Sequence, residues 1–147
     1  MIRRPPRSTH CISSAASDVY KRQPIFAVAI LLPLVTRSTA IQILIPLLLM
    51  LTKDFFIGFH SLMLPVYGCL IIFSILGNLV KPIPATLIGV LIWHVVVNFC
   101  VWWLYGGDLL QTYIMAIPFD FNLLVSTLIC VLIGQLCLKL YSRYYYS

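Results

Sequence analysis

Acidic residues are scarce in this 147-residue chain, and glutamate is absent. The four carboxylates are all aspartates, and charged residues make up only 10% of the composition. Without glutamate there can be no HExxH zinc motif and no glutamate acid or base. GxSxG, Walker and dinucleotide-binding glycine patterns are missing as well. The sequence therefore argues against an enzyme and predicts no cofactor, so any ATP hydrolysis would have to come from a separate subunit.

The five cysteines also lack the spacing of a functional set. There is no CxxC pair, and no histidine is placed to complete a group of metal ligands. Four of the five lie in apolar runs, where cysteine behaves as a small apolar side chain. Neither a disulfide framework nor a metal site is predicted.

The net charge of +6 is concentrated at the N-terminus. Residues 1–23 contain five basic residues and one Asp, which leaves only +2 for the other 124 residues. This segment has no apolar stretch long enough for a secretory signal, although its composition is compatible with a transit peptide. It more closely resembles translated sequencing-adapter sequence. We therefore expect residues 1–23 to be a non-native or disordered leader, and we expect no binding to nucleic acid.

Long apolar runs fill residues 24–147 and predict an all-α, polytopic transmembrane helical domain in the lipid bilayer. Hydrophobic residues make up 61% of the chain, and its mean hydropathy is +1.00. About five spans are expected. The predicted segments are a short remnant or re-entrant piece at 24–35, spans at 40–59, 62–80 and 85–105, an interfacial segment at 109–122, and a last span at 121–141.

The span at 85–105 carries the most informative side chains. Its 21 residues would extend roughly 31 Å as a helix, enough to cross the hydrocarbon core. His94, Asn98, Trp102 and Tyr105 follow one another at helical spacing and share one face. Polar groups at that depth need partners. Two interpretations remain open for His94 and Asn98: hydrogen bonds to a neighbouring helix, or contact with a ligand.

Alternating the spans separates the charges. One side receives only basic residues, and the positive-inside rule makes that side, with the C-terminus, cytoplasmic. The basic residues on it are Arg37, Lys81, Lys139 and Arg143. On the opposite side we predict an outward-facing cavity with Asn98 and His94 at its floor and aromatic walls, suited to a small amphipathic solute.

The remaining candidates at that cavity each have a plainer interpretation. Trp102 and Tyr105 could instead form an interfacial aromatic belt. Asp54 either points inward as a ligand acceptor or forms a solvated pair beside Lys53. His60 follows a glycine in a loop. No carboxylate is expected in the middle of the membrane.

The last predicted span bears a stripe of small residues that favours close helix packing. They are Thr127, Cys130, Gly134 and Cys137.

Three segments, at 51–60, 98–107 and 113–134, resemble a family of uncharacterised bacterial membrane proteins described as transport proteins. That family is similar in architecture to the substrate-binding S components of energy-coupling-factor transporters. The matching positions are Asp54, Phe55, Phe56, Gly58, Phe59 and His60, then Asn98, Phe99 and Trp102, then Ile117, Pro118 and Phe119.

The resemblance implies six spans in an intact member, the bacterial inner membrane, and transmembrane and ATPase partner subunits. The first span of the family is missing or truncated here, which puts docking to such partners in doubt.

The leading hypothesis is a small-solute (vitamin-like) binding subunit of a membrane transporter, with Asn98, His94, Trp102, Asp54, His60 and Tyr105 at its site. The alternative is a structural or assembly membrane protein with no ligand, in which the polar stripe only holds helices together.

Overall fold

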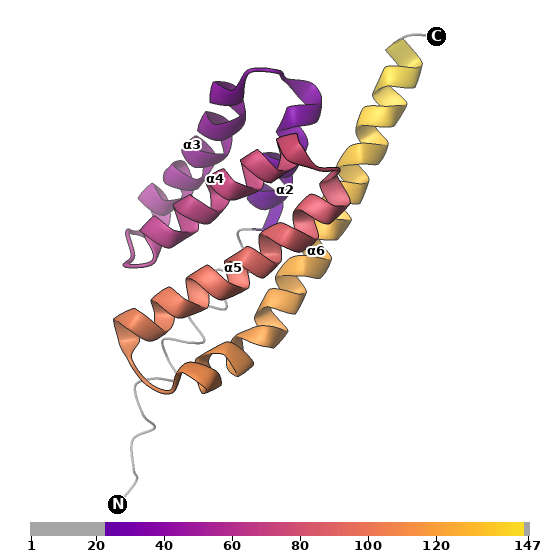
Figure 1. Cartoon of the computed structure of the whole chain (residues 1–147). Helices are drawn as coiled ribbons and strands as arrows, with labels where there is room; N and C mark the ends of the chain where they lie inside the picture. Colours follow the sequence, from indigo (N-terminus) through magenta and orange to yellow (C-terminus); the bar gives the residue numbers. More distant parts are fainter. Residues whose placement is uncertain (1–22, 146–147) are drawn as a thin grey trace, which may run out of the picture.

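The computed structural model describes residues 23–145, and these residues form five α-helices with no strand among them. The all-α prediction is confirmed. The predicted leader at 1–23 lies outside the described residues apart from Gln23. With the labels of Figure 1, the helices are α2 (Gln23–Val35), α3 (Thr39–Ile57), α4 (Met63–Leu79), α5 (Pro82–Tyr105) and α6 (Leu109–Tyr145).

Three of these helices, α3, α5 and α6, are long and apolar enough to cross a bilayer. The two shorter helices, α2 and α4, are equally apolar in character, with 13 and 17 residues. Large aliphatic and aromatic side chains cover the outside of the bundle, as expected where lipid is the solvent. The chain is therefore a membrane protein.

The predicted break between an interfacial segment at 109–122 and a span at 121–141 is wrong. Helix α6 runs through both as one element of 37 residues, with Pro118 inside it. A proline removes a single backbone hydrogen bond, and neighbouring helices in a membrane bundle tolerate that loss. Gln111 and Asp120 were the other reasons for expecting a break. Asp120 is buried and lies within hydrogen-bond distance of His94 and Asn98 on α5.

Helix α5 begins at Pro82, three residues before the predicted start. Proline is well suited to the first turn of a helix, where its missing N–H would have no partner in any case. The prolines at 82 and 84 therefore start α5 rather than merely separating it from α4.

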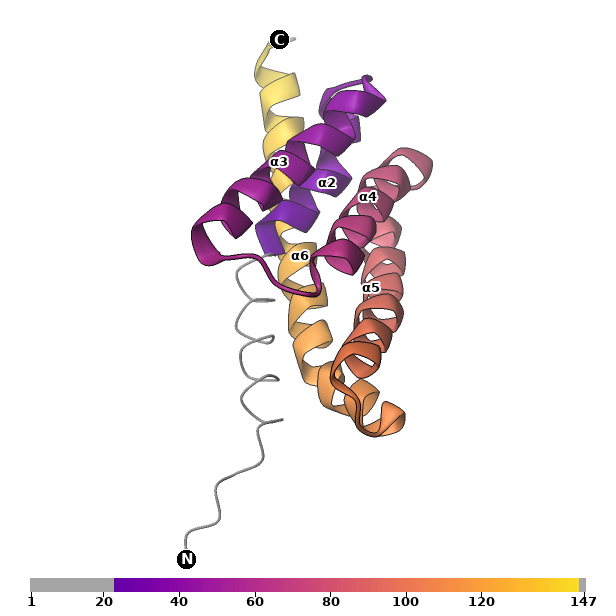
Figure 2. The same cartoon turned by 90° about the vertical axis from the view of Figure 1, so that its left-hand side faces the viewer.

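Helix α2, expected to be a remnant or a re-entrant piece, lies at the centre of the bundle and packs against the four other described helices. Figures 1 and 2 show it between the α3–α4 pair and α6. Its inward residues Phe26, Ala29 and Ile30 are almost completely buried. A Cβ added to Gly77 of α4 would lie 2.6 Å from the backbone oxygen of Ile30, so this glycine is required for the close approach of α2 and α4.

The small-residue stripe on α6 packs as predicted over part of its length. Thr127 is buried, and a Cβ on Gly134 would overlap Cδ1 of Leu31 on α2. Cys130 is half-buried against the core, whereas Cys137 is exposed. The stripe therefore brings α6 close to α2.

Candidate functional site: a buried polar cluster between two helices

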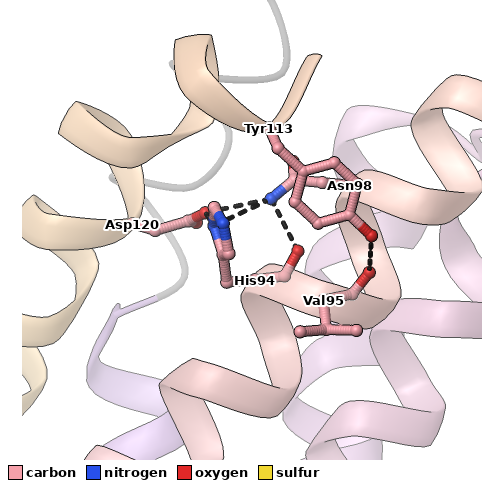
Figure 3. Close-up of polar contacts among 5 residues, drawn as sticks. All are labelled: His94, Val95, Asn98, Tyr113 and Asp120. Atoms are coloured by element: carbon pink, nitrogen blue, oxygen red, sulfur yellow. Dashed lines mark hydrogen bonds and ion pairs between the residues drawn. The ribbon is translucent and has the colours of Figure 1, made fainter. Parts of the chain in front are cut away.

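A cluster of three polar side chains joins α5 to α6. His94 and Asn98 lie one turn apart on α5, and Asp120 projects from α6 (Figure 3). Nδ1 of His94 is 2.6 Å from Oδ2 of Asp120, and Nδ2 of Asn98 is 3.1 Å from the same oxygen. We call His94, Asn98 and Asp120 the polar cluster.

The donors and acceptors of this cluster follow from its contacts. Nδ1 of His94 and Oδ2 of Asp120 share one hydrogen bond at 2.6 Å, in which a carboxylate at Asp120 accepts the Nδ1–H. Nδ2 of Asn98 faces two acceptors, Oδ2 of Asp120 and the backbone oxygen of His94 at 2.7 Å. A flipped amide would place an oxygen against both acceptors, so the amide orientation follows from the network. The 3.2 Å separation of Asn98 Nδ2 and His94 Nδ1 is then a contact between two donors.

The cluster lies halfway along a spanning helix. His94 is the 13th of the 24 residues of α5, and the helix rise places it roughly 17 Å from either end. The Asp120 side chain is 10% exposed and that of His94 is 23% exposed. The prediction that no carboxylate lies in the middle of the membrane is therefore wrong, because α6 continues past Asp120 and pairs it with the middle of α5.

Tyr113 of α6 lies beside the polar cluster. Its ring meets that of His94 edge to face, with 5.3 Å between the centroids. Its hydroxyl donates a hydrogen bond to the backbone oxygen of Val95 at 2.8 Å (Figure 3). This hydrogen bond is a second link between α5 and α6, and the ring of Tyr113 lies at the edge of the polar cluster.

The two aromatic candidates lie near the turn that joins α5 to α6. The indole N–H of Trp102 donates to the backbone oxygen of Gly107 at 3.1 Å, and Tyr105 is 56% exposed. Asp108 caps α6, since its Oδ1 accepts the N–H of Leu110 at 2.9 Å. Trp102 therefore braces the turn, one to two helical turns from Asn98.

The two predicted site residues on α3 and in the α3–α4 connection, Asp54 and His60, occupy a different environment. Asp54 points inward and is 1% exposed, so its solvated-pair interpretation is wrong. Its Oδ2 accepts a hydrogen bond from the hydroxyl of Tyr67 on α4 at 3.0 Å. His60 lies in the connection between α3 and α4, where its backbone oxygen accepts the N–H of Met63. Asp54 thus links α3 to α4 and makes no bond with the polar cluster.

A second polar network, which the sequence analysis missed, also joins α3 to α4. Gln42 is 2% exposed, and its Oε1 accepts a hydrogen bond from Nδ2 of Asn78 at 2.5 Å. The hydroxyl of Ser74 donates to the backbone oxygen of Gln42 at 3.2 Å. The available signal was a polar residue near the end of each of two neighbouring apolar runs, Gln42 in the first turn of α3 and Asn78 in the last turn of α4.

Asp120 was the principal omission from the predicted site. It was visible as a carboxylate inside an apolar stretch, and the only mid-span polar pair available to it was His94 with Asn98. Because residues 109–122 were assigned to the membrane interface, Asp120 did not need a partner inside the membrane, and its pairing with His94 and Asn98 was not predicted.

The chain matches a protein family over most of its length. The model of a family of unknown function (DUF6580) matches residues 8–145. The chain belongs to this family. The match includes every residue of the polar cluster and both pairs of consecutive helices, α3 with α4 and α5 with α6. No curated protein and no solved structure matches the chain. Membership of the family therefore brings no known activity, and the functional argument depends on the site itself.

Proposed function

We propose that this protein is the solute-binding membrane subunit of a transporter, and that the polar cluster is its binding centre. The proposal is carried by one observation: the carboxylate of Asp120 on α6 is held beside the middle of α5 by an imidazole and an amide, and the imidazole remains 23% exposed. Trp102 and Tyr105 then belong to the turn at the end of α5, away from the deepest part of the site.

The energetic argument starts from the position of Asp120. A carboxylate at the centre of a membrane helix costs about 2.5–3.5 kcal/mol on insertion scales, and such residues mark ligand, ion or proton pathways. Interhelical hydrogen bonds in membrane proteins return about 0.6 kcal/mol each on average. Two such bonds to Asp120 do not offset that cost, so helix packing alone gives no reason to place an acid there.

The rival function, a structural or assembly protein without a ligand, has support from the second network. Gln42, Ser74 and Asn78 hold α3 to α4 with neutral groups only. This network shows that two helices of this chain are joined by side-chain hydrogen bonds without any charged group. The polar cluster between α5 and α6 differs from it by the carboxylate and the ionisable ring.

Orientation and location are part of the proposal. The α2–α3 and α4–α5 connections lie toward the same end of the bundle as the C-terminus, and the other two connections lie toward the opposite end (Figure 1). Arg37 and Lys81 are in the first set of connections. The positive-inside rule supports a cytoplasmic C-terminus in a bacterial inner membrane. Energy would come from transmembrane and ATPase partner subunits, as in energy-coupling-factor transporters, or from an ion gradient.

The test is ligand-dependent thermal stabilisation of the purified full chain in detergent, screened against pools of vitamins, nucleobases, amino acids and amines. Two matched variants separate binding from packing. Asn98 and Asn78 each donate to the carbonyl of the residue four positions earlier and to one side chain on a neighbouring helix. Asn98→Leu and Asn78→Leu therefore remove the same number of hydrogen bonds, although Asn98 is buried beside a carboxylate and Asn78 is exposed beside a neutral amide.

We expect each variant to lose about 0.6–2 kcal/mol of stability. Only Asn98→Leu should lose stabilisation by the solute, because only Asn98 lies in the polar cluster. If no pool stabilises the native protein, or if both variants bind the solute equally well, the transport proposal is wrong and the assembly function is favoured.

A further inference from the structure

Exposed basic side chains gather at one end of the bundle, away from the polar cluster. Helices α2, α4 and α6 all run toward this end, where the α2–α3 connection, the α4–α5 connection and the C-terminus lie (Figure 1). Lys and Arg residues lie on each of these segments, and all of their side chains are exposed. We call the following residues the basic layer: Arg37, Lys81, Lys139 and Arg143.

Two close helix contacts place the basic layer at a common depth. A Cβ on Gly77 of α4 would meet the backbone of Ile30 on α2, and a Cβ on Gly134 of α6 would meet the next residue of α2. The three helices are therefore in register at this level. From here α4 ends two residues later and α2 about four residues later, while the basic residues of α6 follow Gly134 by five and nine residues. At the helical rise of about 1.5 Å per residue, the basic layer begins roughly 3–14 Å beyond the contacts.

Apolar and aromatic side chains surround the basic residues of α6. Leu136, Leu140, Tyr141 and Tyr144 are all exposed on the same turns as Lys139 and Arg143. Tyrosine is enriched at the level of lipid headgroups, where its ring lies in apolar surroundings and its hydroxyl is hydrated. Long Lys and Arg side chains reach the headgroups from slightly different depths. This mixture suits the boundary between acyl chains and headgroups better than the surface of a soluble acidic protein.

The positive charges of the basic layer are not neutralised by the part of the chain that the structure describes. Within residues 23–145, none of the four side chains forms a salt bridge. The aspartates of these residues are engaged elsewhere. Asp54 accepts a hydrogen bond from a tyrosine of α4, Asp108 caps α6 at the opposite end of the bundle, and Asp120 belongs to the polar cluster. The basic layer is therefore available to an anionic partner.

We propose that the basic layer is a binding surface for anionic phospholipids. The phosphate of a lipid such as phosphatidylglycerol accepts charge-assisted hydrogen bonds from Lys and Arg, while its acyl chains cover the exposed leucines of α6. Each Lys or Arg beside an anionic surface contributes about fivefold to affinity. Phosphatidylcholine has the same phosphate but no net charge, so it should bind more weakly. This surface is separate from the polar cluster and does not depend on the transport proposal.

The test is native mass spectrometry of the full chain in a neutral detergent. It counts the lipid molecules retained from equal amounts of phosphatidylglycerol and phosphatidylcholine with identical acyl chains. We expect phosphatidylglycerol to bind at least about fivefold more tightly, and the preference to shrink at high salt because exposed charges are screened. Replacing Lys139 and Arg143 together by Gln should weaken phosphatidylglycerol binding at least about fivefold, and neutralising all four residues should abolish the preference.

Three controls separate local charge from other causes. Combining Lys139→Arg with Arg143→Lys preserves the charge and should keep the preference. Asp108→Asn raises the net charge at the opposite end, where asparagine also caps well, and should leave the preference unchanged. Soluble glycerol phosphate should bind far more weakly than the lipid. The basic residues of 1–22 are present in every variant, so differences between variants report on the basic layer alone.

Several outcomes would overturn the lipid assignment. Equal retention of the two lipids, or a preference that survives neutralisation of the basic layer, would show that these residues do not select anionic lipid. A preference that Asp108→Asn strengthens would attribute it to net charge. Glycerol phosphate that binds as tightly as the lipid would indicate a simple phosphate site. Polyglutamate that binds more tightly than phosphatidylglycerol, through the same four residues, would assign the surface to an acidic protein.

Discussion

The contact between α2 and α4 supports a sharp prediction about stability. Replacing Gly77 by Ala would place a Cβ 2.6 Å from the backbone oxygen of Ile30 and 3.1 Å from its Cα. Neither atom can move by rotating a side chain, because both belong to the backbone of α2, which packs against all the other described helices. Relief therefore requires a shift of α2 itself.

The magnitude follows from two opposing effects. Overpacking a well-filled core costs typically about 1–3 kcal/mol. Alanine is the better helix former in water by about 1 kcal/mol, which partly hides that cost. Gly68 on the same helix provides the control, since a Cβ there has nothing within 4 Å. Gly77→Ala should be less stable than Gly68→Ala by about 1–3 kcal/mol, the overpacking term alone.

The assay is reversible unfolding of the two variants by SDS in mixed micelles, followed by circular dichroism. The comparison cancels the propensity term because both glycines lie within α4. Equal stability of Gly77→Ala and Gly68→Ala would refute the central position of α2 and the backbone contact on which it depends.

Two further predictions concern the turn between α5 and α6. Gly106 has φ 72° and ψ −169°, a conformation almost confined to glycine, and nothing lies near its missing Cβ, so Gly106→Ala should cost about 1–3 kcal/mol through backbone strain alone. An unchanged SDS midpoint for this variant would contradict the turn geometry. Trp102→Phe removes the indole hydrogen bond to Gly107 at 3.1 Å and should lower stability by about 0.5–1.5 kcal/mol. The same titration measures it, and a variant as stable as the native protein would show that this bond does not brace the turn.

Several features of the site could be anticipated from residue spacing. The interval between His94 and Asn98 placed them on one helix face, and the structure shows both in one hydrogen-bonded cluster. For His94 and Asn98 the sequence left two interpretations, hydrogen bonds to a neighbouring helix or contact with a ligand, and these two do not exclude each other. The side chains hydrogen-bond to a neighbouring helix, and the side chain of His94 still remains 23% exposed.

Other features required the packing of helices. Asp54 lies beside Lys53 in sequence, which suggests a surface pair, but the rotation of α3 against α4 turns Asp54 inward to Tyr67. A helix has no fixed rotation until its neighbours are in place. Sequence alone therefore could not decide between the two environments.

The amino-acid sequence by itself determined the class of this protein. Long uncharged apolar runs must form helices that satisfy their own backbone hydrogen bonds once lipid replaces water, and rare polar residues on them must then find partners. Only the tertiary structure decided which partners those are. The pairing of Asp120 with His94 and Asn98, like the central position of α2, depends on the relative rotation and depth of separate helices. These are controlled by contacts between residues that lie far apart in the chain.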